Sequence, residues 1–325
     1  MTVTPGAGGT SGTIGAAIDV GSNSIHLLIA AVGVDGGVAY LRSLLDESVL
    51  LGLGAIVDRE GSLPPDAGEA TVAAIADYVE RSRAIGAGRI TLVATEPFRR
   101  AANRSVVQAD VLRATGRPLH LLSHEAEAEL TLLGVTRGRP ATDRLLVMDI
   151  GGGSTEIILA APGSDPLVGA IPTGSSRLTS ALVEHDPPSW FEINSLRAEA
   201  KRLLDGMPAG HPERGVLVGG SGTNLCRLMR VESAVLDRDR LEKAFAALAS
   251  TPAAELVATR GVNLRRARQL AAGAAMAEAV LLRYELERLE VSDASLREGA
   301  ILAAWLVDDA WPERLSELVA GNPEG

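Results

Sequence analysis

Ala17-Ile18-Asp19-Val20-Gly21-Ser22-Asn23-Ser24 and Val147-Met148-Asp149-Ile150-Gly151-Gly152-Gly153-Ser154 decide the fold of this chain, because the two stretches align without a gap. In each copy an apolar run leads to an aspartate, a loop of small residues follows, and a second apolar run resumes over 25–29 or 157–159. This pattern is typical of two buried strands joined by a tight turn whose glycines expose backbone N–H groups. An internal repeat of this kind predicts two related lobes.

The segments around the two copies alternate between apolar-periodic helices and short strands. Helices are expected over 65–85, 106–114, 125–135, 175–184, 191–204, 264–290 and 296–307. Strands are expected over 90–94, 167–171 and 215–218, the last followed by a glycine-rich loop at 219–223. The predicted fold class is therefore α/β, with an N-terminal lobe over 14–138, a C-terminal lobe over 139–318 and an interlobe cleft. Residues 1–13 and 319–325 are expected to be disordered tails.

The composition excludes several classes of protein. The 325 residues, 46% of them hydrophobic, can bury a core in each of two domains, and no apolar run reaches the roughly eighteen residues of a membrane span. The single cysteine, Cys226, cannot form an internal disulfide. A formal net charge of -10 argues against a broad nucleic-acid-binding surface. We therefore expect a cytoplasmic protein that binds neither membranes nor nucleic acids.

The two glycine loops are candidate phosphate-binding sites, because backbone N–H groups in such loops can surround phosphate oxygens. The predicted contacts are Gly21, Ser22, Asn23, Ser24, Gly151, Gly152, Gly153, Ser154 and Thr155. A tight hairpin alone would also require glycine, but an aspartate at the same place in both loops favours a ligand site. Neither loop has the nucleotide-binding Gly-x-x-x-x-Gly-Lys-Ser/Thr pattern or a Rossmann fingerprint.

Charged side chains beside these loops are the candidate metal ligands and phosphate clamps. Asp19 and Asp149 end their strands, where a carboxylate either holds a hydrated Mg²⁺ or caps the turn. Glu156 interrupts an apolar strand and points either into the cleft or to solvent. Arg99 follows the strand over 90–94, at the sheet edge where ligands usually bind, and could clamp a phosphate or lie on the surface.

Other charged residues have no assigned role from spacing alone. Glu125, Glu127 and Glu129 open a helix, where acidic residues are favoured in any case by the macrodipole. The five histidines show no metal-ligand spacing and are given no chemistry. The arginines within 265–268 are interpreted as a solvated helix end rather than as part of an anion track.

Together, these segments resemble the exopolyphosphatase and guanosine-pentaphosphate phosphohydrolase (Ppx/GppA) family over roughly residues 14–307. The resemblance is carried by 17–24 and 149–156, with support from 94–103, 123–128, 219–223 and 296–299. It implies two duplicated actin/Hsp70/sugar-kinase-like (ribonuclease H-like) lobes. Two departures stand out: Ala126 replaces a usual glutamate, and Glu96-Pro97 replaces small polar residues, which puts the substrate contacts near Arg99 in question.

The resemblance also implies a chemistry. Glu127 takes the place of the family's water-activating glutamate, with Glu156 and Asp149 as further catalytic residues. Asp19, Asp149 and Glu156 would hold Mg²⁺, with Mn²⁺ as the alternative ion and a monovalent cation as an additional one. The implied substrates are inorganic polyphosphate or guanosine pentaphosphate. The implied assembly is a homodimer, for which the Ala-rich helix over 264–290 offers a contact face.

Two other functions stay open at this point. One is an ATP-dependent small-molecule kinase or ATPase of the same superfamily, in which the glycines of 219–223 would hold adenosine. The other is a non-catalytic sensor of polyphosphate or of a guanosine alarmone. The retained acids Asp19, Glu127, Asp149 and Glu156 argue against the sensor, since binding alone needs no base.

Overall fold

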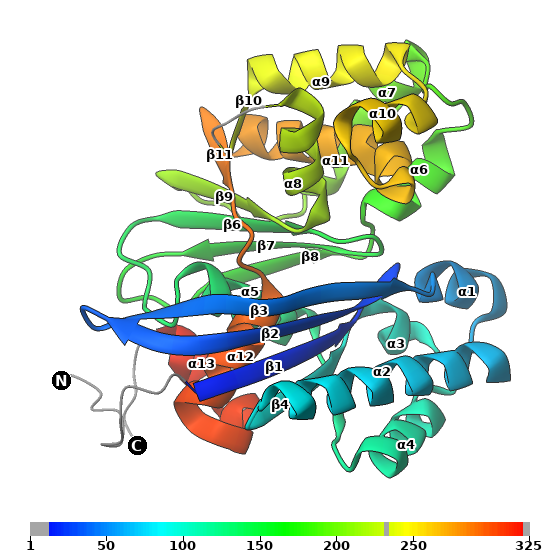
Figure 1. Cartoon of the computed structure of the whole chain (residues 1–325). Helices are drawn as coiled ribbons and strands as arrows, with labels where there is room; N and C mark the ends of the chain where they lie inside the picture. The colour runs from blue at the N-terminus through cyan, green and yellow to red at the C-terminus, as the bar shows by residue number, and fades with distance from the viewer. Residues whose placement is uncertain (1–12, 231–233, 321–325) are drawn as a thin grey trace.

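The computed structural model describes residues 13–230 and 234–320, and these fold into two lobes, each built on its own mixed sheet. The first sheet has the order β3-β2-β1-β4-β5 and contains β1 (Thr13–Val20), β2 (Ser24–Asp35), β3 (Val38–Leu50), β4 (Arg89–Ala94) and β5 (Leu119–Leu121). The second has the order β10-β11-β9-β6-β7-β8 and contains β6 (Leu145–Ile150), β7 (Thr155–Ala160), β8 (Leu167–Ile171), β9 (Arg214–Val218), β10 (Val235–Asp237) and β11 (Arg288–Val291). The two sheets lie one above the other in Figure 1.

The predicted repeat is confirmed as a pair of matching hairpins. Strands β1 and β2 pair antiparallel, as do β6 and β7, and each turn is closed by a 3.0 Å backbone hydrogen bond. The donors and acceptors are Gly21 N to Ser24 O in one turn and Gly151 N to Ser154 O in the other. Strand β4 runs parallel to β1, and β9 runs parallel to β6. Each lobe therefore places an aspartate and a glycine loop at the same edge of its sheet.

Helices cover the outer face of each sheet. Around the first sheet lie α1 (Leu53–Glu60), α2 (Pro65–Ile85), the short α3 (Glu96–Arg100) and α4 (Arg104–Thr115). Around the second lie α6 (Ser175–Leu182), α7 (Trp190–Leu204), α8 (Gly220–Met229), α9 (Arg238–Ser250), α10 (Ala253–Arg260) and α11 (Leu264–Arg283). Each set closes a separate apolar core.

A third core lies between the two sheets (Figure 1), where α5 (His124–Val135) packs against α12 (Leu296–Val307). The turn η1 (Asp308–Ala310) and helix α13 (Trp311–Ala320) follow α12, and α13 also contacts α5. The predicted C-terminal lobe, 139–318, includes α12 by chain order. In the structure, however, α12 packs on α5 and on β1, β2 and β4 of the first sheet. The end of the chain therefore completes the first lobe.

Two element predictions were wrong in the second lobe. The helix predicted over 264–290 ends at Arg283, because Glu285 adopts a left-handed backbone (φ 55°) and 288–291 pairs with β9 as a strand. The loop predicted at 219–223 is a loop only at Gly219, since α8 begins at Gly220. The sequence also gave no sign of β3, β5, β10, α1, α3, α9, α10 or α13.

The Ala-rich face of α11 is not available as the predicted dimer contact. Its alanines from Ala271 to Ala279 lie in the core of the second lobe, none of them more than 4% exposed. A homodimer would have to use another surface. This outcome follows from packing, because small side chains also let a helix approach its neighbours closely inside a core.

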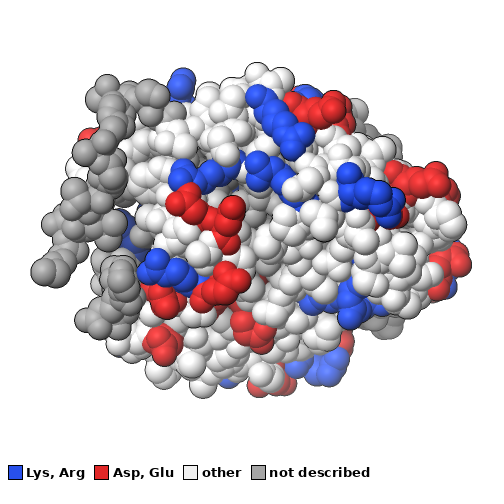
Figure 2. Space-filling view, turned by 90° about the horizontal axis from the view of Figure 1, so that it is seen from below, with Lys and Arg blue, Asp and Glu red and all other residues white. Residues whose placement is uncertain are grey.

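The predicted tails, 1–13 and 319–325, fall almost wholly outside the described residues. Of their described residues, Thr13 belongs to β1, and 319–320 belong to α13, which ends at Ala320. No helix in the described part of the chain is long and apolar enough to cross a membrane. On the face seen in Figure 2, the described Lys and Arg side chains lie mostly beside Asp and Glu.

Candidate active site

The two glycine loops meet at a cavity of about 750 Å³ between the lobes, lined by residues of both. A Cβ atom added to Gly152 would lie 2.6 Å from Asn23 Nδ2, and one added to Gly153 would lie 2.5 Å from Ser22 Oγ. Real Cβ atoms do not approach other atoms this closely. A side chain at either position would push these groups aside, so the two glycines let a loop of one lobe touch the loop of the other.

Four acids surround this meeting point: Glu156 is buried, and Asp19, Glu127 and Asp149 are partly buried. Burial raises the pKa of Asp19 to about 7, with a further contribution from the nearby Asp149 carboxylate. Burial likewise raises the pKa of Asp149 to about 6 and that of Glu156 to about 8. The pKa of Glu127 lies well above its usual range, because the carboxyl is buried and Glu156 is close by. Such a concentration of acids needs a cation or shared protons.

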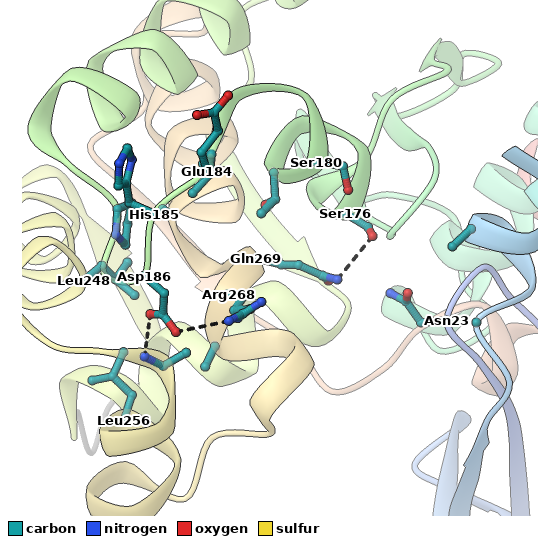
Figure 3. A pocket seen from close by; sticks show the side chains of 18 of the residues that line it. Asn23, Ser176, Ser180, Glu184, His185, Asp186, Leu248, Leu256, Arg268 and Gln269 are labelled. Carbon is teal, nitrogen blue, oxygen red and sulfur yellow. Dashed lines mark hydrogen bonds and ion pairs between the residues drawn. The ribbon is translucent and has the colours of Figure 1, made fainter. Parts of the chain in front are cut away.

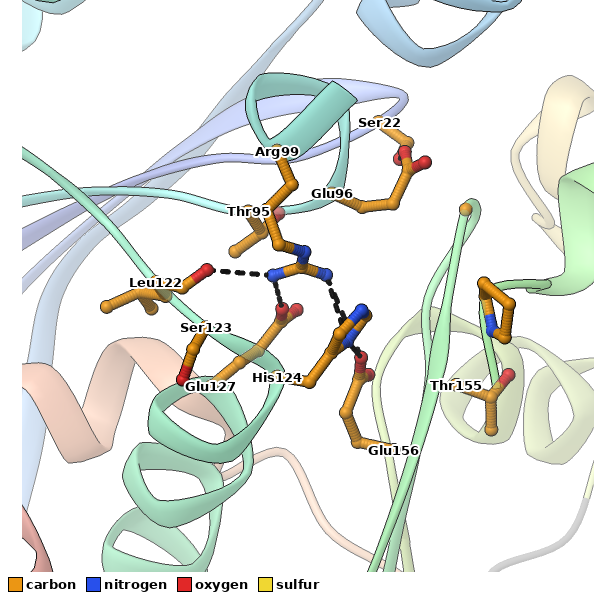
Figure 4. Close-up of polar contacts among 12 residues, drawn as sticks. Ser22, Thr95, Glu96, Arg99, Leu122, Ser123, His124, Glu127, Thr155 and Glu156 are labelled. Carbon is orange, nitrogen blue, oxygen red and sulfur yellow. Dashed lines mark hydrogen bonds and ion pairs between the residues drawn. The ribbon is translucent and has the colours of Figure 1, made fainter. Parts of the chain in front are cut away.

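Arg99 is the cation that lies beside Glu127 and Glu156 (Figure 4). Its guanidinium donates to Glu127 Oε2 at 2.7 Å and to the backbone oxygen of Leu122 at 3.1 Å. It also lies 3.1 Å from His124 Nδ1 and 3.9 Å from Glu156 Oε1. Arg99 therefore connects Glu127, the candidate that would activate water, to Glu156 on the second hairpin.

His124 bridges the same groups from the start of α5. Its Nδ1 atom lies 2.8 Å from Glu156 Oε1, and Ser154 also hydrogen-bonds Glu156. Burial lowers the pKa of His124, and the positive charge of Arg99 lowers it further. A neutral imidazole is the form that can also bind a metal ion.

The donor set fits a hard divalent cation such as Mg²⁺. Asp19 Oδ1 is buried and has no hydrogen-bond partner among the described residues, although a carboxylate oxygen in that position normally has one. Separately, one ligand atom each from His124, Glu127 and Glu156 lies within 4.8 Å of the other two. Carboxylate oxygens are the ligands that Mg²⁺ prefers, and acids whose pKa is raised by burial would bind such an ion with release of protons.

Two arginines from distant parts of the chain also line the cavity. Arg266, at the start of α11, lies so close to Gly220 that a Cβ there would be 2.8 Å from Arg266 Cζ. Its NH1 group is buried and has no hydrogen-bond partner within the described part of the chain. Arg297, on α12, donates to Asp46 at 2.5 Å. The interpretation of Arg266 as part of a solvated helix end was therefore wrong.

A sequence profile of the Ppx/GppA phosphatase family matches residues 31–307. The chain belongs to this family. It is 29% identical over 299 residues to exopolyphosphatase 1 of Mycobacterium tuberculosis, covering 88% of this chain and 86% of that protein. It is 27% identical over 305 residues to the guanosine-5'-triphosphate,3'-diphosphate pyrophosphatase of Vibrio cholerae, covering 88% of this chain and 58% of that one.

Solved structures agree with this Ppx/GppA assignment. The crystal structure of the Aquifex aeolicus member of the Ppx/GppA protein family matches with a TM-score of 0.77 at 28% identity, covering 91% of this chain and 99% of that chain. The predicted family is thus confirmed, and so is the predicted fold of two related α/β lobes.

Most of the residues predicted from the sequence come together in this Ppx/GppA chain. Gly21–Ser24, Gly151–Ser154, Asp19, Glu127 and Asp149 all line the cavity. The hydroxyl of Thr155, in contrast, donates to the backbone oxygen of Thr173, and Arg99 is held by Glu127. Neither of these two side chains lines the cavity, and neither does that of Glu156, which faces His124 and Arg99.

The sequence reasoning missed His124, Glu96 and Arg266 as residues of the site. A signal existed for two of them. His124 lies three residues before Glu127, so both fall on one face of α5. Arg266 lies four residues before the buried Leu270, which places it on the inward face of α11.

A second cavity, of about 540 Å³, begins at Asn23, which lines both spaces (Figure 3). Its walls come from α6, α10, α11 and the segment 183–188 of the second lobe, and from residues 51–56 of the first. In it Gln269 donates to Ser176 Oγ at 3.2 Å, and Asp186 pairs with Arg268 at 3.5 Å. This cavity holds fewer acids than the first and lies away from Glu127.

Proposed function

We propose that this protein is an exopolyphosphatase, which releases the terminal orthophosphate of inorganic polyphosphate and also accepts guanosine pentaphosphate. The observation that carries the proposal is the meeting of two glycine loops, one from each lobe, at a cavity that Glu127 also lines. Both substrates end in a phosphoanhydride, so one site can serve both. The names of the relatives in Mycobacterium tuberculosis and Vibrio cholerae support the same two substrates.

In this proposal the backbone N–H groups of the two loops hold the oxygens of the terminal phosphoryl group. Donors fixed in place before the substrate arrives stabilise the charge of a loose phosphoryl-transfer transition state. The unpartnered NH1 of Arg266 supports a contact with a phosphate farther along the chain. An anionic ligand there would supply the partner that this buried guanidinium lacks.

Glu127 is the proposed general base. Its carboxylate takes a proton from a water molecule while the water oxygen forms a bond to the terminal phosphorus. The anhydride P–O bond breaks, and its electron pair leaves with the shortened chain. A carboxyl with a raised pKa suits this role, because a base is most effective when its pKa approaches the working pH. Arg99 fixes the carboxylate at 2.7 Å.

Asp19, Asp149 and Glu156 are the proposed holders of Mg²⁺. When bound, the ion would offset the negative charge of the phosphoryl oxygens. The orphaned Asp19 Oδ1 supports this assignment, and His124 offers a further donor beside Glu156. A cytoplasmic location and a homodimer remain part of the proposal.

The test is phosphate release by the purified protein with Mg²⁺, using polyphosphate, guanosine pentaphosphate and ATP in parallel. Glu127→Gln should lower kcat by roughly 10²- to 10⁴-fold, the usual contribution of a general base, and should change KM little. Glu129→Gln is the matched control: it lies on the same helix, but its carboxylate accepts a hydrogen bond from Ser316 at 2.8 Å. Parental turnover by Glu127→Gln would refute the assignment of the base.

One observation favours the kinase or ATPase as a second candidate. Gly219 and the first residue of α8, Gly220, line the cavity, where a glycine turn could hold a nucleotide. Arg266, however, lies against Gly220 and fills part of that space. Tight ATP binding with phosphate transfer to an acceptor, and no release from polyphosphate, would favour this candidate.

A further inference from the structure

Four charged side chains connect the two lobes directly beside the two glycine loops, Gly21–Ser24 and Gly151–Ser154, which we now call the phosphate loops because of the proposed function. We call them the Glu96 cluster; they are Asp58 on α1, Glu96 and Arg100 on α3, and Arg177 on α6. Arg100 pairs with both acids, contacting Glu96 through Nε and Asp58 at 2.7 Å. Arg177 also pairs with both, at 2.7 Å from Glu96 and 3.0 Å from Asp58. The four side chains thus form a closed cycle of alternating charge.

The cluster contacts both phosphate loops. On the first loop, Ser22 Oγ donates to Glu96 Oε2 at 2.9 Å (Figure 4). On the second loop, Arg177 NH1 donates to the backbone oxygen of Gly153 at 3.3 Å. Gly153 also lies directly against Glu96, since a Cβ on it would be 2.4 Å from Glu96 Oε2. A single carboxylate is therefore in contact with both loops.

The cluster also fixes the helix that carries Arg99. Helix α3 has only five residues, so hydrogen bonds within it cannot set its position alone. Glu96 and Arg100 point to the cluster, and Arg99, between them in sequence, points to Glu127. Glu96 is 5% exposed, and an acid this buried is retained only with partners.

We infer that the Glu96 cluster holds the two phosphate loops and Arg99 in register across the lobes, with Glu96 as the positioning residue. This inference rests on the proposed function for its kinetic consequence, but not for its structural one. The cluster joins the lobes at the point where, in the proposed function, both loops bind the terminal phosphoryl group.

The expected kinetic effect is a loss of turnover rather than of affinity. Glu96→Gln keeps the shape and the acceptor for Ser22 but removes the charge that pairs with both arginines. Loops misplaced by a fraction of an ångström should lower kcat by about 10- to 100-fold, with KM changed less. Arg177→Met should act alike, and the double variant should lose little more than either single variant, because both break one network. Arg177→Lys should recover part of the loss.

The matched control is Glu278→Gln, which breaks an equally buried ion pair with Arg197 at 2.5 Å inside the second lobe. It should change thermal stability but leave kcat as in the parent protein. Losses that multiply in the double variant of Glu96 and Arg177 would overturn the inference. An equal loss in Glu278→Gln would overturn it as well.

Hydrogen–deuterium exchange tests the structural claim without any substrate. Glu96→Gln should speed amide exchange at Gly151–Ser154 in the other lobe as well as at Gly21–Ser24. Faster exchange at Gly21–Ser24 alone, or at neither loop, would contradict the inference. If the parent protein hydrolyses none of the substrates, the proposed function fails, while the exchange result still decides the role of the cluster.

Discussion

At the scale of single residues, the acids of the cleft destabilise the fold when they ionise without a partner. The pKa of Asp19 is about 7 in the folded state, above its unfolded value, so the native state binds more protons between about pH 4 and pH 7. Stability is therefore lost as the pH rises through that window. With metal chelated, Asp19→Asn should raise the free energy of unfolding at pH 8 by on the order of 2 kcal/mol.

The measurement is urea unfolding at pH 4, 6 and 8 in the presence of a chelator. The gain should become small near pH 4, where Asp19 is protonated in the folded protein and about half protonated in the unfolded chain. Asp165→Asn, at an exposed site, is the control and should change little at any pH. A gain for Asp19→Asn that is independent of pH would contradict the argument, as would a loss at pH 8.

The same residues show what the sequence alone could predict. Asp19 and Asp149 were found because the chain repeats itself, and a repeat needs no three-dimensional knowledge. His124 and Arg266 were missed, because their contacts lie far along the chain: His124 meets Glu156 on β7, and Arg266 lies against Gly220. Glu96 was noted as a departure, but its partner Arg177 lies 81 positions farther along the chain in the other lobe. Long-range ion pairs of this kind leave no periodic signal.

At the scale of elements, helices α5 and α12 touch backbone to backbone. A Cβ on Gly299 would lie 1.8 Å from the backbone oxygen of Leu130, and one on Gly134 would lie 2.4 Å from that of Ser295. Alanine normally favours a helix over glycine by about 1 kcal/mol. We nevertheless expect Gly299→Ala to destabilise the protein by about 1–3 kcal/mol, because the helices must move apart. Urea unfolding midpoints measure this change.

Gly206→Ala provides the comparison, since a Cβ there would meet nothing within 4 Å. It should leave the midpoint nearly unchanged, whereas Gly134→Ala should lower the midpoint, as Gly299→Ala does. Should Gly299→Ala prove as stable as the parent, the close contact of α5 and α12 would be wrong.

Element boundaries followed from the sequence only where a single local rule decided them. Helix α2 spans the predicted 65–85, because Pro65 begins it and Gly86 ends it in the left-handed conformation. For α11 the local pattern misled, because apolar residues continue at helical spacing through Leu286 and Leu289. Both side chains are buried, but Leu286 follows the end of the helix and Leu289 lies in β11. Tertiary pairing with β9 decided the outcome, and no local pattern contains it.

At the scale of the whole molecule, the first lobe is not one continuous segment of chain. Its sheet is formed by residues 13–121, but α12 and α13 return from the far end to cover α5 and the inner face of that sheet. The second lobe has its own core on the outer face of its sheet, formed by α6–α11. Loss of the end of the chain should therefore affect the two lobes unequally.

A chain that ends at Asp293 tests this organisation. The outer core of the second lobe keeps all its members, so amides of α7, α9 and α11 should stay protected from hydrogen exchange. The core between the sheets loses Leu296, Ile301, Trp311 and their neighbours, so α5 and the first sheet should exchange faster and expose apolar surface to a hydrophobic dye. A peptide of residues 294–320 added in trans should restore protection in the first lobe. Equal loss of protection in both lobes would mean that they fold as one unit, and unchanged protection in the first would mean that α12 adds nothing to it.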